Sequence, residues 1–244
     1  MPSVDLVNKI KGLREVDKIQ VELLSTKEEV TLYPLSVGQQ KELMKHSIDG
    51  PIGAVSILKE LNDIIFQNIA SKGTSPLVID KYPMLLRMRT SSLGNKITIS
   101  GKTYDISDLP TNIKFNNKEL SSSVSYGGIT VNVSTPTLEK DNMFMDKAIQ
   151  HIKSVTTNAN KEMITTLFTF EIAKFVDNIV FDGEQLTFAD LPIGDCIEVI
   201  NNLPLKLNQQ ILSYINKIRE KENKLITFSD GVIIPINTLF FVTE

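Results

Sequence analysis

The sequence predicts an α+β protein, with helical N- and C-terminal parts, short β-hairpins and a central β-rich subdomain. Two periodicities support this class. Apolar and polar residues alternate over 19–32 and in stretches of 95–136, which is typical of strands with one buried face. Over 54–70 and much of 137–218, apolar residues recur every three or four positions, which is typical of amphipathic helices. The chain therefore divides into four expected segments: 1–16, 17–94, 95–136 and 137–244.

The first segment, 1–16, is interpreted as an N-terminal arm or a short helix. Its apolar residues are spaced by three and would form one stripe: Val4, Val7, Ile10 and Leu13. A frayed terminus is an equal alternative. A terminal arm that orders only against a partner would have the same pattern.

The second segment, 17–94, begins with a strand–turn–strand unit, since the period-two pattern is interrupted only by the polar run 25–29. Ser36 is expected to cap the next helix, with Gln39 as its reciprocal partner in a capping box. Helices are expected at 36–46, 54–70 and about 81–91.

The third segment, 95–136, is expected to hold about five short strands. Ser100-Gly101, Asn116-Asn117 and Gly127-Gly128 supply the turn residues between them, because Gly and Asn adopt positive φ readily. One of the strands would cover 113–115. The serine run 121–123 is interpreted as a loop or a weak edge strand.

The fourth segment, 137–244, returns to helices, with a strand at 175–181 that stops at Asp182-Gly183. A terminal hairpin is expected from 225–228 and 232–236, turning on Asp230-Gly231. Phe240 and Phe241 then read as an exposed apolar tail that could anchor in a partner's pocket. Deleting 238–244 should, on this interpretation, impair partner binding more than folding.

Composition excludes several classes of protein. The 244 residues carry a net charge of −3, so there is no global electrostatic footprint for nucleic acid, and no nucleic-acid partner is expected. The single cysteine, Cys196, rules out an internal disulfide and a zinc site built on several cysteines. No apolar run reaches the length of a membrane helix, and the N-terminus lacks the pattern of a signal peptide. We expect no membrane association, no cofactor and no metal.

Standard catalytic motifs are missing from the sequence. It contains no phosphate-binding loop, no dinucleotide fingerprint and no nucleophile elbow. The two histidines, His46 and His151, have no second histidine four residues on. A pairing of one of them with Cys196 would allow a small hydrolase with a cryptic site. Cys196 lies between apolar positions of a helix, where cysteine usually behaves as a buried hydrophobe.

Arg87 and Arg89 are the charges most suggestive of a contact. Two positions apart on a helix, they point to different faces and do not form a phosphate clamp. One of them could pair with a carboxylate in the fold or at an interface. The alternative is that both lie on a solvated face.

Three stretches together resemble the baseplate hub proteins of T-even-like contractile-tailed phages. The first is 19–43, a hairpin followed by LYPLSVGQQKELM, and the second is 79–95, IDKYPMLLRMRTSSLGN, in which Arg89, Ser92 and Gly94 match the family pattern. The third is 175–241, ending in ITFSDGVIIPINTLFF. Residues 95–123 depart from the pattern, and the cysteine pair of some relatives is missing, so no metal site carries over.

The resemblance implies a non-enzymatic structural or assembly component of the baseplate hub, assembled in the host cytoplasm and retained in the virion tail. It would bind other hub and tail proteins and the tape-measure protein, in several copies around the tail axis. Phe240, Phe241, Arg87 and Arg89 are the expected partner-binding residues. An assembly chaperone that leaves before the virion matures is the alternative within this class, and a cryptic hydrolase is the alternative outside it.

Overall fold

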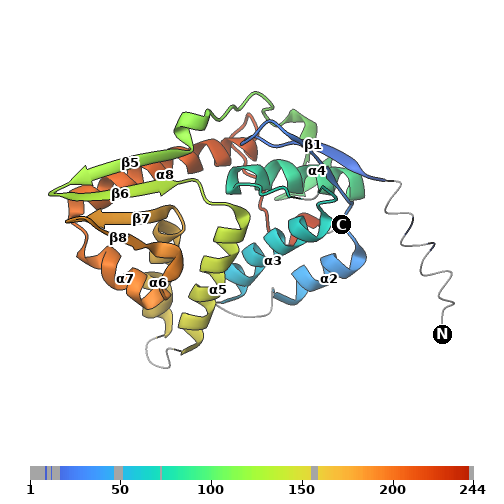
Figure 1. Ribbon diagram of the computed structural model, residues 1–244. Helices are drawn as coiled ribbons and strands as arrows, with labels where there is room; N and C mark the ends of the chain where they lie inside the picture. Colours follow the sequence, from blue (N-terminus) through green and yellow to red (C-terminus); the bar gives the residue numbers. More distant parts are fainter. Residues whose placement is uncertain are drawn as a thin grey trace.

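The computed structural model (Figure 1) describes residues 9, 12, 17–46, 52–71, 73–154 and 159–241. The expected N-terminal arm 1–16 therefore lies, apart from two isolated residues, outside the described part of the chain. In the described residues, helices and antiparallel strands occupy separate blocks, which confirms the predicted α+β class.

The described residues of the N-terminal block form one hairpin and three α-helices. Strands β1 (Ile19–Glu22) and β2 (Glu29–Leu32) pair antiparallel and are followed by α2 (Val37–His46), α3 (Gly53–Asn68), the 3-10 turn η2 (Val78–Asp80) and α4 (Lys81–Leu93). The predicted capping box at α2 is confirmed. The Gln39 N–H donates to Ser36 Oγ at 3.3 Å, and the Ser36 N–H donates to Gln39 Oε1 at 3.0 Å.

The expected β-rich segment 95–136 is split between two sheets. Strands β3 (Lys96–Ile99) and β4 (Lys102–Asp105) form a hairpin of their own. After the 3-10 turn η3 (Ile106–Asp108), the strand expected at 113–115 is absent, so that prediction is wrong. The Asn116 side chain instead caps a 3-10 turn, η4 (Asn117–Glu119), accepting from the Lys118 N–H while Glu119 accepts from the Asn116 N–H.

A four-stranded antiparallel sheet forms one end of the molecule, in the order β5-β6-β7-β8. Its strands are β5 (Ser121–Tyr126), β6 (Ile129–Ser134), β7 (Val176–Phe181) and β8 (Glu184–Thr187). The serine run 121–123 is thus part of an edge strand, and β8 was not predicted from the sequence. Since β6 pairs with β7, this sheet joins residues on both sides of the boundary expected at 136/137.

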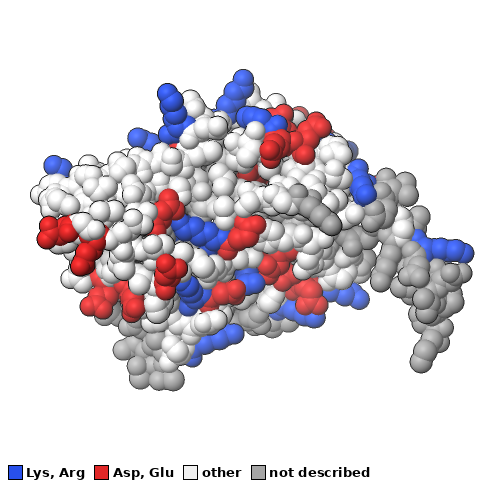
Figure 2. All heavy atoms as spheres, in the orientation of Figure 1, with Lys and Arg blue, Asp and Glu red and all other residues white. Residues whose placement is uncertain are grey.

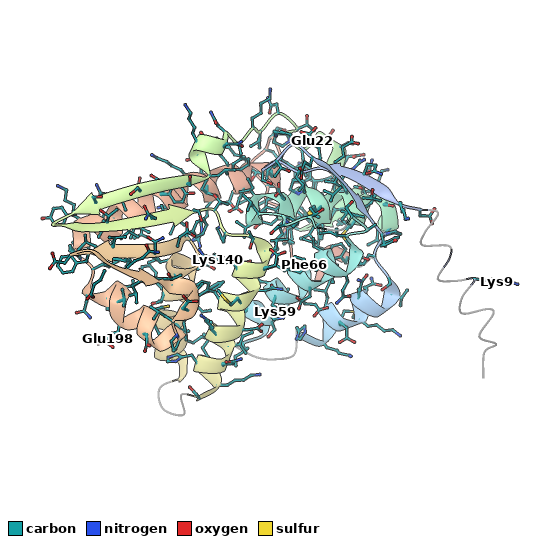
Figure 3. All side chains as sticks on the ribbon, viewed as in Figure 1. Lys9, Glu22, Lys59, Phe66, Lys140 and Glu198 are labelled. Carbon is teal, nitrogen blue, oxygen red and sulfur yellow. The ribbon has the colours of Figure 1, made fainter. Side chains whose placement is uncertain are left out.

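Helices cover the sheet and connect it to the N-terminal block (Figure 1). They are α5 (Leu138–Ser154), α6 (Ala159–Ala173), α7 (Ile193–Asn202) and α8 (Leu205–Leu225), with 3-10 turns η5 (Phe188–Asp190) and η6 (Thr238–Phe241). Helix α8 packs on β5, and α5 contacts both α6 and α3. The Lys140 ammonium on α5, labelled in Figure 3, donates to Asp177 Oδ1 at 2.7 Å and to the Val176 carbonyl at 3.0 Å, which ties α5 to β7.

The terminal hairpin expected at 225–236 is confirmed as a chain reversal, in which the Phe228 N–H donates to the Val232 carbonyl at 2.8 Å, but no strands form there. Residue 225 still belongs to α8, and only one isolated bridge forms, between Thr227 and Ile233. The amphipathic pattern of α8 continues to Leu225, whose side chain is buried, so the helix extends into the region assigned to a strand. One continuous core runs through the described residues and includes side chains from β1 to η6.

Candidate functional site

Helix α4 is the element around which the candidate sites are arranged. Its start is tied to the β1–β2 turn by the buried carboxylate of Asp80, which accepts the Ser25 N–H at 2.9 Å and the Ser25 hydroxyl at 2.6 Å. The Leu77 N–H donates to the same carboxylate at 2.8 Å. Burial raises the pKa of Asp80, although these hydrogen bonds act in the opposite direction. Asp80 therefore fixes the position of α4 relative to the N-terminal hairpin.

Arg89 is buried, with only 3% of its surface exposed, so the solvated-face alternative is wrong for this residue. Its guanidinium donates to three backbone carbonyls: Phe240 at 3.0 Å, Gly94 at 2.6 Å and Lys96 at 2.7 Å. Burial lowers the pKa of Arg89. Arg89 therefore joins the end of α4, the start of β3 and the C-terminal segment, and its side chain is not available on a surface for a partner.

The other two residues singled out in the 79–95 segment also have structural roles. Ser92 Oγ accepts the Leu35 N–H at 3.1 Å, which holds the chain between β2 and α2 against α4. Gly94 ends α4 with φ of 83°, a backbone conformation that L side chains rarely adopt. Arg89, Ser92 and Gly94, which carry the family resemblance in this segment, thus all stabilise the C-terminal end of α4 and its contacts.

Phe240 and Phe241 are buried, at 1% and 0% exposure, so the expectation of an exposed tail is wrong. Their rings pack edge to face with centroids 4.7 Å apart. Backbone carbonyls of the pair accept from Arg89 and from the Gln40 side-chain amide. In this structure both rings belong to the core. The pocket that holds these two rings is thus formed by the chain itself and not by a partner.

Arg87 lies on the opposite side of α4 from Arg89 and is exposed, as expected from their spacing. It borders an apolar groove with a volume of about 410 Å³ between α4 and the segment 106–113. The other residues that line this groove are Leu24, Pro83, Leu86, Thr90, Asn95, Ile106, Ser107, Leu109, Pro110, Thr111, Ile113 and Leu225. A shallow apolar surface beside one exposed guanidinium is suited to an apolar side chain accompanied by a carboxylate.

A second cavity of about 410 Å³ lies among α3, α4, α5, α6 and α8 and has a strongly charged lining. Three basic and three acidic side chains converge on it: Lys81, Lys174, Arg219, Asp141, Glu171 and Glu222. Leu58, Val78, Met145 and Phe175 supply apolar walls, and Tyr82 and Asn223 complete the lining. We call this the charged cavity.

Four of the six charges form direct pairs. Lys174 Nζ lies 2.9 Å from Asp141 Oδ1, whose other oxygen accepts from the Asn62 side-chain amide at 2.9 Å. Arg219 pairs with Glu171. Burial alone would raise the pKa of Asp141, but Lys174 and the neighbouring Lys81 outweigh it and hold the pKa below its usual value.

Lys81 and Glu222 are the charged groups of this lining that have no direct ionic partner among the described residues. Burial lowers the pKa of Lys81 to about 8 and raises the pKa of Glu222 to about 7. Burial likewise raises the pKa of Tyr82 to about 12. Each shift follows from removing water from a charge without supplying an opposite charge in contact.

Sequence reasoning did not find the charged cavity. Its side chains come mainly from five helices that are far apart in the sequence. Two sequence patterns include residues of the cavity: the lysine that follows Asp80 and the mixed charge run 217–224. Both patterns are typical of solvated helix ends. Only the packing of α4 against α8 brings Lys81 and Glu222 to one cavity.

Of the residues considered for catalysis, Cys196 donates its thiol to the Phe188 carbonyl at 3.9 Å. Cys196 is buried, and burial raises the pKa of its thiol to about 11, which disfavours the nucleophilic thiolate. His151 packs near the start of α7, with its Cε1 3.8 Å from the position a Cβ on Gly194 would take. His46 lies on α2, where its Nε2 is 3.7 Å from Glu60 Oε2. Cys196 lines neither the groove nor the charged cavity.

Metal sites and membrane-spanning helices are the remaining features to consider in the described residues. No group of three or more His, Cys, Asp or Glu side chains gathers there in a way that could hold a metal ion. In the same part of the chain, no helix combines the length and the apolar character needed to cross a bilayer. Figure 2 shows basic and acidic side chains interspersed over the visible face of the molecule, without a large patch of one sign.

The fold and the two cavities describe an α+β protein with one continuous core. Residues 16–224 match the family described as T4 bacteriophage base plate protein, and the chain belongs to that family. The match spans most of the chain and includes α4, all of the residues that line the charged cavity and, apart from Leu225, those that line the groove. Neither the comparison with curated proteins nor the comparison with solved structures found a match. The protein is therefore a phage baseplate protein with a structural role in the tail.

Proposed function

We propose that the protein is a non-enzymatic component of the baseplate hub that binds other hub proteins and the tape-measure protein. The observation that carries this proposal is the family match over residues 16–224, which makes the chain a baseplate protein. The hub assignment rests on the likeness of segments 19–43, 79–95 and 175–241 to hub proteins. The buried thiol of Cys196, with its raised pKa, supports a role that depends on contacts and not on covalent chemistry.

Quantitative mass spectrometry of purified tails and virions tests the hub assignment. A hub component is present in mature particles at a fixed copy number per tail and is cross-linked to other hub proteins. If the chain were found in assembly intermediates and not in mature particles, it would be an assembly chaperone. If it were found only with proteins of the outer baseplate, the hub proposal would be wrong.

We further propose that the groove beside Arg87 is the contact with a neighbouring hub protein. The partner surface would carry an apolar side chain for the groove and a carboxylate for Arg87. This combination matches the lining, which is apolar apart from Arg87 and a few uncharged polar residues. Because Arg87 is exposed, reversing its charge should not disturb the fold.

The matched experiment compares Arg87→Glu with Lys118→Glu, a charge reversal at another exposed position. Both variants should keep the stability of the natural protein within about 0.5 kcal/mol. Arg87→Glu should reduce incorporation into tails, because a like charge would then face the partner's carboxylate. Equal incorporation of the two variants would exclude Arg87 from the contact.

A further inference from the structure

The buried ammonium group of Lys81 in the charged cavity has few partners. Lys81 is 6% exposed and lines the cavity. Within the described residues its ammonium donates one long hydrogen bond, 3.3 Å, to the Leu58 carbonyl, although an ammonium has three donors. The carboxylate of Asp141, which attracts Lys81 electrostatically, already accepts from Lys174 and from Asn62. Two donors of Lys81 are therefore left for a group inside the cavity.

Glu222 is the second group that lacks a direct partner in the described part of the chain. It belongs to α8 and lines the cavity together with Lys81. A protonated carboxyl can donate one hydrogen bond, and an ionised one cannot. The cavity thus contains a buried cation and a carboxyl group that is easily protonated, beside the apolar side chains Met145 and Phe175.

We propose that the charged cavity is a binding site for a carboxylate group, which accepts hydrogen bonds from Lys81 and from the carboxyl of Glu222. The aliphatic part of the ligand would lie against Leu58, Val78, Met145 and Phe175. This inference goes beyond the hub function and does not depend on it. The carboxylate can come from a free short-chain acid or from a Glu or Asp side chain of a neighbouring protein, and the chemistry of recognition is the same.

The charge of the lining favours a ligand with a single negative charge. With Glu222 ionised, three basic groups face three acidic groups, and protonation of Glu222 leaves a net charge of +1. One negative charge balances this surplus, whereas the phosphate dianion would leave an uncompensated charge in a partly buried site. The Arg219 side chain is 41% exposed, so the cavity is open to solvent beside this residue.

Binding should be linked to proton uptake. The groups that face the ligand are Lys81 and Tyr82 from α4, Asp141 from α5, Glu171 from α6, Lys174 directly after α6, and Arg219 and Glu222 from α8. Near neutral pH, Lys81 and Glu222 are the members of this set whose pKa values, about 8 and about 7, put them in their titration range. The ligand requires both to be protonated, so its affinity should fall about twentyfold between about pH 6 and about pH 8.

The test is a titration of the full-length protein with sodium acetate, followed by NMR of the methionine methyl groups. Met145 lines the cavity, so its methyl signal reports binding there, and a Met145→Leu variant assigns it. Acetate should shift this signal more than sodium chloride or phosphate does at equal ionic strength. Butyrate should bind severalfold more tightly than acetate, because its two additional methylene groups contact the apolar walls.

Two variants separate the proposed site from a general salt effect. Lys81→Met should weaken acetate binding at least about tenfold, as expected for loss of a charge-assisted hydrogen bond, while Lys118→Met at an exposed position should not change it. Glu222→Gln should reduce the pH dependence from about twentyfold to about twofold, since only Lys81 then titrates. This variant keeps the proposal testable if Lys81→Met does not fold.

The origin of the carboxylate is then decided by native mass spectrometry and by tail incorporation. A small acid that co-purifies with the natural protein and not with Lys81→Met identifies a free ligand. No bound acid, together with reduced incorporation of Lys81→Met but not of Lys118→Met into tails, identifies a partner's side chain. The proposal is overturned if acetate does not move the Met145 signal beyond the chloride control, or if Lys81→Met binds as well as the natural protein.

Discussion

Replacing Arg89 with Met should lower the free energy of unfolding by about 3 kcal/mol. The guanidinium donates to three carbonyls, and the hydrogen bond to Phe240 is fully buried, whereas those to Gly94 and Lys96 are partly buried. A buried acceptor that loses its donor costs about 1–3 kcal/mol, and each partly hydrated acceptor costs about 1 kcal/mol. Among the described residues, Arg89 is a buried charge without a carboxylate partner, so replacing it also removes the cost of burying that charge. The expected loss of stability is therefore smaller than the sum of the three hydrogen-bond costs.

Arg87 provides the matched control on the same helix. Arg87→Met removes the same side chain from an exposed position and should change the stability by no more than about 0.5 kcal/mol. Equilibrium urea denaturation, followed by circular dichroism, measures both variants against the natural protein. Arg89→Lys should lie in between, because a lysine keeps the charge but cannot reach three carbonyls with the geometry of a guanidinium. A loss below about 1 kcal/mol for Arg89→Met would refute the role of Arg89 as the connection between α4, β3 and the C-terminal segment.

Three further predictions follow from burial. Deleting 238–244 should lower the urea midpoint strongly, because truncating a single buried Phe typically costs about 3–5 kcal/mol and this deletion removes both Phe240 and Phe241. An unchanged urea midpoint would show that these two side chains do not pack in the core. Glu222 binds its proton more tightly in the folded state, because its pKa is raised from 4.5 to about 7, so its contribution to stability falls as the pH rises from 4.5 to 7, by up to about 3 kcal/mol. The pH dependence measured by urea denaturation over this window should therefore be flatter in Glu222→Gln, and identical profiles would contradict the assignment. Cys196→Ala should cost about 1 kcal/mol by thermal denaturation and leave tail incorporation intact; loss of incorporation at normal stability would point to a functional thiol.

Local patterns were enough to predict most helices and hairpins. The α3 pattern, the Ser36–Gln39 capping box and the turn at Gly127-Gly128 all depend on residues within a few positions of one another. Each of these signals is local, so it can be recognised without knowing how the rest of the chain folds. The α+β class could therefore be derived from the sequence.

The errors arose where two local signals competed. At 113–117 the alternating apolar residues favoured a strand, but the Asn116 side chain satisfies nearby backbone groups and produces a 3-10 turn. At 225–236 the turn residues Asp230-Gly231 favoured a hairpin, but Leu225 completes the apolar face of α8. A strand also needs a neighbour, and only the Thr227–Ile233 bridge forms in this region.

The sequence by itself determined the class of fold, the positions of most elements and, through segments 19–43, 79–95 and 175–241, the likeness to baseplate proteins. Only the tertiary structure decided which charged and aromatic side chains are buried. Arg87 and Arg89 are indistinguishable by residue type, yet one is exposed and the other connects three parts of the chain. Lys81 and Glu222 share a cavity because helices far apart in sequence pack together, and burial is a property of that packing that no local pattern records.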